Sequence, residues 1–189
     1  MSNTSLELTS EVFQERINNV YNLLEKSALH IFQANYGHER KVIEAVVKLK
    51  EQGSLVLTLK ILDALKALLE TEEGKDILST YKRLHNILKN EKFEEDTSER
   101  IKNVSFKTPY EIDLDITYNA RSMNLGLCMF RNDIDGALNH LKELIEPLNN
   151  FLDNVIVNDE DIDQKHNKLS LLKKVDKVFQ RICKWEKLL

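Results

Sequence analysis

Residues that interrupt helices are scarce in this chain: its 189 residues include two prolines and five glycines. Proline removes a backbone hydrogen-bond donor and glycine is the next poorest helix former, so the stretches between them are free to stay helical. Within those stretches apolar residues recur at steps of three and four, the spacing of one helix face. The sequence therefore predicts an all-α protein, a helical bundle of about six to seven helices.

The charge balance restricts what such a bundle can bind. Hydrophobic residues make up 42% of the chain, enough for the core of a single domain, which we place at residues 10–189 after a disordered or added segment at 1–9. The formal net charge of −4 argues against a protein that coats nucleic acid through excess positive charge, and we expect no DNA partner. Contact with RNA would need a local basic face.

Neither the N-terminal segment nor the cysteines indicate secretion or membrane insertion. MSNTSLELTSEVF has no basic or apolar signal region, and no window approaches the roughly 18 apolar residues that a membrane span needs. We therefore expect a cytoplasmic protein without a membrane partner. Cys128 and Cys183 are far apart and lack a CxxC partner, which predicts packed thiols rather than a disulfide or a metal site.

Start and stop signals divide the chain into helices. Thr108 to Glu111 combine a T-x-x-E capping box with proline at the first helical position. Asn132 is the expected cap of the next helix, and Asp159–Asp161 that of the last. The polar stretch Asn90 to Lys107 lacks a sustained period and is predicted to be a flexible loop. The expected helices cover about 10–32, 42–52, 55–69, 75–89, 109–131, 133–155 with a kink or restart at Pro147, and 163 nearly to the C-terminus.

The longest predicted helix, which begins at Pro109, carries apolar residues along much of its length. They are Ile112, Ile116, Tyr118, Met123 and Leu127.

Catalytic and metal-binding patterns are absent from the sequence. We find no glycine-rich phosphate loop, HEXXH motif, nucleophile elbow or ATP-binding synthetase signature. His38 and His85 have no partner at helical spacing and are interpreted as surface or interhelical residues. We therefore expect neither catalysis nor a metal or cofactor in this chain alone.

The last helix opposes the charge of the whole chain. Between Lys165 and Lys187 it holds eight Lys or Arg residues and only Asp176 and Glu186 as acids. Either Lys173 or Lys174, followed by Lys177, Arg181 and Lys184, gives steps of three and four, apart from the apolar positions of the same helix. The stripe could bind phosphates, or it could be a solvated face that offsets acidic neighbours.

Two long segments resemble a known family. LIEPLNNFLDNVIVNDEDIDQKHNKLSLLKKV, residues 144–175, resembles the C-terminal region of the β subunit of the bacterial two-subunit glycyl-tRNA synthetase. LKILDALKALLETEEGKDILSTYKRLHNILKNEK, residues 59–92, is similar to another region of the same subunit, with its Tyr-Lys-Arg and Asn-Ile-Leu motifs at 81–83 and 86–88. A weaker match lies upstream, in Phe13, Glu15-Arg16, Tyr36-Gly37-His38 and Ile43 to Val46.

That resemblance implies a helical anticodon-binding domain of the DALR type. The tetrad for which the type is named falls on Ile162-Asp163-Gln164-Lys165, where only the basic end, Lys165, is present. The implied function is to position tRNA(Gly) for aminoacylation carried out elsewhere in the enzyme. The implied partners are tRNA(Gly), the α subunit and the rest of the β subunit, and ATP and Mg²⁺ would serve the full glycine–tRNA ligase in translation.

Under this resemblance the candidate tRNA-binding residues fall into three groups. Phosphate contacts are expected from the basic residues, base-edge contacts from bidentate groups, and stacking from planar ones. The phosphate group is Lys82, Lys89, Lys165, Lys168, Lys174, Lys177, Arg181 and Lys184; the base-edge group is Arg83, Asn86 and Asn167; the possible stacking group is Arg16, Tyr36 and Tyr81. Core spacing also allows Tyr81 to be buried. The alternative function is a helical protein-interaction module for subunit assembly.

Overall fold

The structure is a computed structural model that describes residues 12, 15–16, 19, 23, 26–28, 30–34, 39–47, 55–91 and 106–189. Within these residues the all-α prediction is confirmed, because seven α-helices have defined bounds and no strand occurs. Described residues between 12 and 34 are also helical. The expected segment at 1–9 and most of the expected loop at 90–107 lie outside the described residues.

The helices are α2 (Arg40–Val46), α4 (Leu55–Leu69), α5 (Glu72–Asn90), α6 (Pro109–Phe130), α7 (Ile134–Lys142), α8 (Ile145–Asn154) and α9 (Ile162–Gln180), followed by a short 3₁₀ turn, η3 (Trp185–Lys187).

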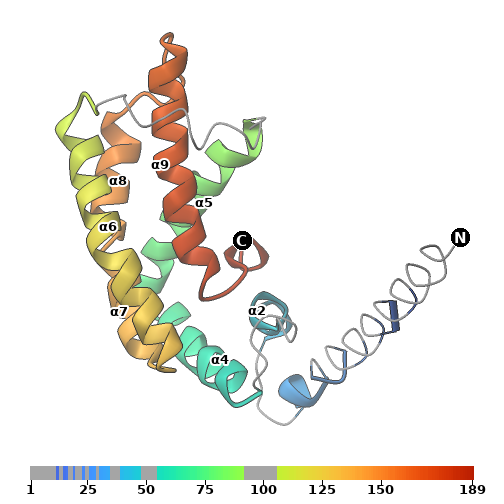
Figure 1. Cartoon of the computed structure of the whole chain (residues 1–189). Coiled ribbons are helices and arrows are strands. Elements are labelled where there is room, and N and C mark those ends of the chain that lie inside the picture. Colours follow the sequence, from blue (N-terminus) through green and yellow to red (C-terminus); the bar gives the residue numbers. More distant parts are fainter. Residues whose placement is uncertain are drawn as a thin grey trace, which may run out of the picture.

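Four helices form the main bundle (Figure 1): α9 packs against α5 and α6, and α8 also packs against both. Contacts near both ends of α9, with Glu91 at one end and Tyr81 at the other, make it antiparallel to α5. Each helix turns an apolar face inward, and the core between them includes Leu84, Leu114, Phe151 and Leu172, all fully buried. Helix α9 therefore has one buried face and one face left to solvent.

The C-terminal segment after α9 packs against the bundle and connects it to α2. Trp185 is fully buried, and its ring meets that of Phe179 edge-on at 5.5 Å between centroids. Its indole Nε1 donates to the Phe179 carbonyl at 2.9 Å, and the Lys184 backbone N–H donates to the Ala45 carbonyl at 2.7 Å. These bonds join the C-terminal segment to both α9 and α2.

The last helix is shorter than the sequence predicts. It ends at Gln180, with Arg181 as its C-cap, instead of continuing nearly to the C-terminus. Beyond that point Ile182, Cys183 and Trp185 are all buried, and their spacing does not lie on one face of a helix. Leaving the helix allows all three side chains to be buried.

Most predicted helix starts are confirmed. Thr108 and Glu111 form the predicted capping box, and Asp161 caps α9 by accepting from two backbone N–H groups. The predicted cap at Asn132 is wrong: Asp133 is the N-cap of α7 and accepts from the Gly136 N–H at 2.9 Å. Asn132 instead has a φ of 57°, a left-handed conformation that asparagine tolerates and that turns the chain between α6 and α7.

Pro147 lies within the first turn of α8. The break falls just before it, at Glu143 and Leu144, and α8 begins at Ile145. A residue in the first turn has no intrahelical acceptor for its N–H, so proline fits there without loss of a hydrogen bond. The sequence allowed a kink or a restart, and the structure shows a restart.

The outer face of α6 is apolar. Four of the five apolar residues noted in this segment are exposed, namely Ile112, Ile116, Met123 and Leu127, while the buried residues of the helix are Glu111, Leu114 and Leu125. Among the described residues, no helix is both long and apolar enough to span a membrane.

Candidate nucleic-acid interface

The solvent face of α9 is basic. Lys174, Lys177 and Arg181 are exposed, whereas Leu171, Leu172, Val175 and Phe179 on the opposite face are buried. A charged stripe and an apolar stripe on one helix are the expected result of a helix that packs on one side only. The structure therefore brings together three of the four residues predicted to form the basic stripe.

Two of these cations are held at the contact between α9 and α6. The Arg181 Nη1 atom donates to the Ser122 carbonyl at 2.6 Å, and the Lys174 ammonium lies 5.9 Å from the centroid of the Tyr118 ring. Both arrangements use α6 groups without a formal negative charge, so the positive charge of each side chain is not neutralised by them. The stripe retains a net positive charge.

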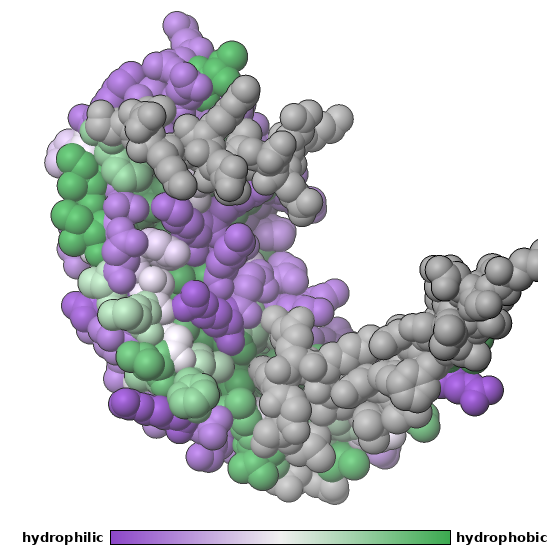
Figure 2. Space-filling model, in the orientation of Figure 1, coloured by the Kyte–Doolittle hydropathy of each residue, from purple (hydrophilic) through white to green (hydrophobic). Residues whose placement is uncertain are grey.

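A second polar stripe lies on the neighbouring helix α5. Lys82, Asn86 and Lys89 are exposed and follow steps of four and three. Ser79, which the sequence reasoning missed, is also exposed and extends this stripe by one turn. The signal that would have found it is the same spacing, since Ser79 precedes Lys82 by three residues. Hydrophilic side chains cover much of the middle of the face shown in Figure 2.

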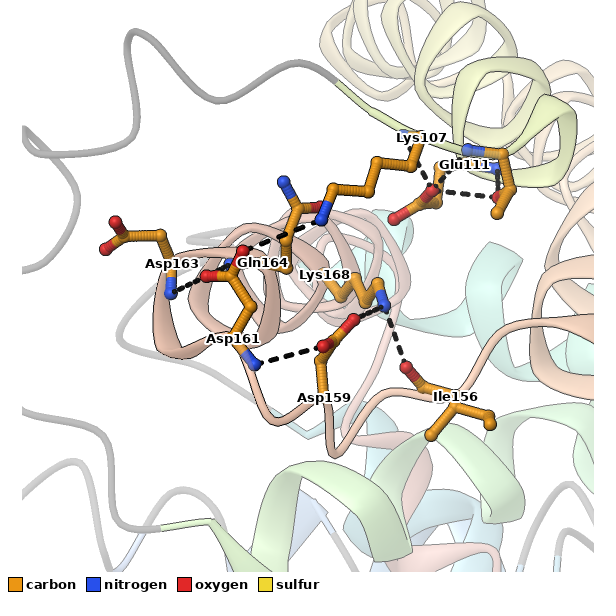
Figure 3. A network of polar contacts seen from close by, with 9 residues as sticks. Lys107, Glu111, Ile156, Asp159, Asp161, Asp163, Gln164 and Lys168 are labelled. Atoms are coloured by element: carbon orange, nitrogen blue, oxygen red, sulfur yellow. Dashed lines mark hydrogen bonds and ion pairs between the residues drawn. The ribbon is translucent and has the colours of Figure 1, made fainter.

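Lys168 does not belong to either stripe. Its side chain is 7% exposed, and its ammonium donates to the Ile156 carbonyl at 2.9 Å and to Asp159 Oδ2 at 2.7 Å. Figure 3 shows the ammonium pointing toward Asp159 and Ile156 in the loop before α9. This hydrogen bond lowers the pKa of the Asp159 carboxyl. Lys168 joins α9 to the connection between α8 and α9, so we exclude it from the interface.

Lys165 and Arg83 each lie in an ion pair between helices. Lys165 Nζ is 3.0 Å from a carboxylate oxygen of Glu91, and Arg83 Nη2 is 2.5 Å from Asp153 Oδ1. Arg83 also donates to Asn149 Oδ1 at 3.4 Å. These partners neutralise the cations and restrict their side chains, so both residues are less suited to RNA contact than the exposed lysines.

Tyr81 and Asn167 are buried. The Tyr81 ring packs at tilted angles within the protein, 5.0 Å from Phe179 and 6.1 Å from Trp185 between centroids, and its full burial leaves no face for a base. Its burial, with smaller effects from Asp176 and Glu186, raises the pKa of the phenol well above its usual range. The structure thus supports the core position that its spacing allowed.

Three predicted residues remain, and one of them lies outside the described part of the chain. Lys184 is exposed but follows the end of α9, in the segment that contacts α2. Arg16 is exposed in a helical stretch, and Tyr36 lies outside the described residues.

The part of the chain that the structure describes offers no group of three His, Cys, Asp or Glu side chains able to hold a metal ion. Neither cysteine forms a disulfide within the chain; Cys183 is buried, in line with the predicted packing, and Cys128 is partly buried. Burial, with a smaller contribution from Asp133, raises the pKa of the Cys128 thiol, which disfavours the reactive thiolate.

Comparison with known families gives a match over the region that contains both stripes. The family model described as "DALR anticodon binding domain" matches residues 77–184, more than half of the chain. This range begins within α5 and ends just after α9.

Curated relatives are similar over most of the chain. The chain is 32% identical over 181 residues to the glycine–tRNA ligase beta subunit of Rickettsia prowazekii, covering 96% of this chain and 26% of that protein. It is 34% identical over 170 residues to the Rickettsia typhi protein of the same name, covering 89% and 24%, and 38% identical over 128 residues to that of Rickettsia bellii, covering 67% and 18%. The chain spans about a quarter or less of the length of these relatives.

Replacing Lys168 with methionine should destabilise the fold by about 2 kcal/mol, because the Ile156 carbonyl and the Asp159 carboxylate lose a buried donor. Urea denaturation followed by circular dichroism measures the loss. Lys177→Met, an exposed position on the same helix, is the matched control and should leave the midpoint unchanged. Equal midpoints for the two variants would contradict the structural role of Lys168.

Replacing Asp176 with asparagine should stabilise the protein at pH 7. Burial, with a smaller contribution from Glu186, raises the pKa of the Asp176 carboxyl in the folded state above its unfolded value of 3.8. The folded protein therefore loses stability as pH rises between these two pKa values, and the loss is complete above the folded one. Asparagine removes this loss and keeps an oxygen that accepts from Tyr81. The advantage over the parent, measured by urea denaturation at several pH values, should disappear below pH 3.8; an advantage independent of pH would contradict this account.

Proposed function

We propose, from the premise that this chain belongs to the DALR anticodon-binding domain family, that it binds the anticodon arm of tRNA(Gly) as part of a glycine–tRNA ligase β subunit. The observation that carries the proposal is the exposed basic face of α9, which lies within the matched region of a chain whose net charge is −4. An acidic protein that binds a polyanion must do so through such a local face.

In this proposal the phosphates are bound by Lys174, Lys177 and Arg181 on α9 and by Lys82 and Lys89 on α5. All five side chains are exposed, and the two helices pack against each other. Cations on two adjacent helices can contact successive phosphates of one strand and so fix its register.

Base recognition would fall to Asn86. Of the three residues expected to read base edges, it is the exposed one without an interhelical ion pair: Arg83 is paired with Asp153 and Asn167 is buried. Its amide can donate and accept at once, which suits the edge of a splayed-out base. Arg16 and Tyr36 remain candidates for stacking.

The chemical steps are assigned to other parts of the enzyme. The relatives are about four times as long as this chain, and the described residues provide no cluster that fits Mg²⁺. We therefore propose that the α subunit and the rest of the β subunit perform aminoacylation with ATP and Mg²⁺ in the cytoplasm, while this chain positions the tRNA.

The first test is discrimination between anticodons. The 189-residue chain is titrated with a tRNA(Gly) anticodon stem-loop and with the same stem-loop carrying a mismatched anticodon, and binding is followed by NMR shift mapping. We expect weaker binding of the mismatched loop, with the largest shifts on α5 and α9. Equal shifts for both stem-loops would contradict recognition of the anticodon and would leave only electrostatic contact with the RNA.

The second test is charge reversal on α9. Replacing both Lys177 and Arg181 with glutamate should weaken stem-loop binding by at least about tenfold and reduce its salt dependence, since each lost phosphate contact lowers the slope of log K against log salt by about 0.7. Lys60→Glu, an exposed reversal on α4, is the control and should have a small effect. Equal losses for Lys60→Glu and for the α9 variant would indicate nonspecific attraction.

A further inference from the structure

Helix α6 presents an apolar stripe that nothing in the described part of the chain covers. The five large apolar side chains of this stripe are 45% to 87% exposed, and the exposed Ala120 lies among them. Successive members of the stripe are three or four residues apart, so they share one side of the helix. In Figure 2 hydrophobic side chains gather along the left edge, where Figure 1 places α6. The stripe consists of Ile112, Ile116, Ala120, Met123, Leu127 and Phe130.

The stripe differs from the scattered apolar residues of an ordinary surface. It runs from Ile112 to Phe130, and the 18 steps between these two residues correspond to about 27 Å of helix and about five whole turns. Contiguous apolar surface of this kind marks a contact site. Phe130 at one end is 87% exposed, so a large ring is fully available to a partner.

The order of residues in the stripe is nearly symmetric about its centre. If a second α6 helix runs antiparallel alongside, Ile112 faces Phe130 of the second copy, Ile116 faces its Leu127, and Ala120 faces its Met123. The small alanine then leaves space for the long methionine side chain at the centre. Every large apolar residue of the stripe has an apolar counterpart.

The charges beside the stripe fit the same arrangement. Asp113 and Arg131 are both exposed and are also 18 residues apart, so both lie on the same flank of the helix. In this dimer the twofold axis is perpendicular to the plane that contains both helices. The same flank of each copy therefore lies on the same side of that plane. This arrangement brings Asp113 of each copy beside Arg131 of the other, giving two ion pairs.

We propose that this chain forms an antiparallel, twofold-symmetric dimer through the α6 stripe. We choose a second copy of this chain as the partner because the apolar residues and the flanking charges of one α6 match those of another α6 that runs antiparallel to it. This contact uses the outer face of α6, whereas the proposed RNA contacts are on α5 and α9, so the proposal does not depend on the RNA function. A single pair of helices buries less surface than a standard interface, and we expect a dissociation constant on the order of 10 µM.

Sedimentation velocity of the 189-residue chain between about 1 and 500 µM tests the proposal. We expect a concentration-dependent change from monomer to dimer, and Met123→Glu should weaken association by more than about 50-fold because it places a charge at the centre of the contact. Ile156→Glu, at an apolar position that is 77% exposed outside the stripe, is the matched control. Circular dichroism checks that both variants are folded. A protein that stays monomeric throughout, or a dimer that Met123→Glu leaves intact, would overturn the proposal.

Charge exchange tests the antiparallel register. Asp113→Lys and Arg131→Glu each place like charges together twice in the dimer and should weaken self-association by about tenfold. A mixture of the two variants restores both ion pairs in the heterodimer, so it should associate as well as the parent. A mixture that associates no better than either variant alone would show that the copies do not pair in this register.

Discussion

The packing of three aromatic rings, Tyr81, Phe179 and Trp185, joins parts of the chain that are distant in sequence. Tyr81 belongs to α5, Phe179 to the end of α9 and Trp185 to the turn that follows. Each ring is fully buried, so the cluster stabilises the antiparallel contact of α5 with α9 and holds the C-terminal segment, which in turn bonds to α2. The orientation of α9, and hence the direction of its basic face, depends on this cluster.

Basic residues serve two purposes on the same helix. Lys165 and Lys168 lie near the start of α9, where their ammonium groups pair with Glu91 and Asp159 and connect α9 to its neighbours. Lys174 and Lys177 lie further along on the solvent side. Since side chains only a few residues apart point in different directions around a helix, position on the helix decides whether a lysine supports the fold or remains exposed to solvent. Counting lysines cannot make that distinction.

Sequence reasoning succeeded where the signal was local. The capping box at Thr108 and Glu111, the cap at Asp161 and the exposed stripe of Lys174, Lys177 and Arg181 follow from neighbours within one or two turns. It failed where distant residues decide. The end of α9 at Gln180 depends on burial of Trp185, and the ion pair of Arg83 depends on Asp153, about 70 residues away.

By itself the sequence determined that the chain is helical, where most of its helices begin, and that its last helix is basic on one side, because spacing and capping are properties of neighbouring residues. Its resemblance to a synthetase β subunit agrees with the family to which the chain belongs. Only the tertiary structure decided which side of α6 meets the core and which cations are neutralised by partners. The outer stripe of α6 contains residues as apolar as those of the interior, so hydrophobicity could not tell one face from the other; packing against α7, α8 and α9 made that choice.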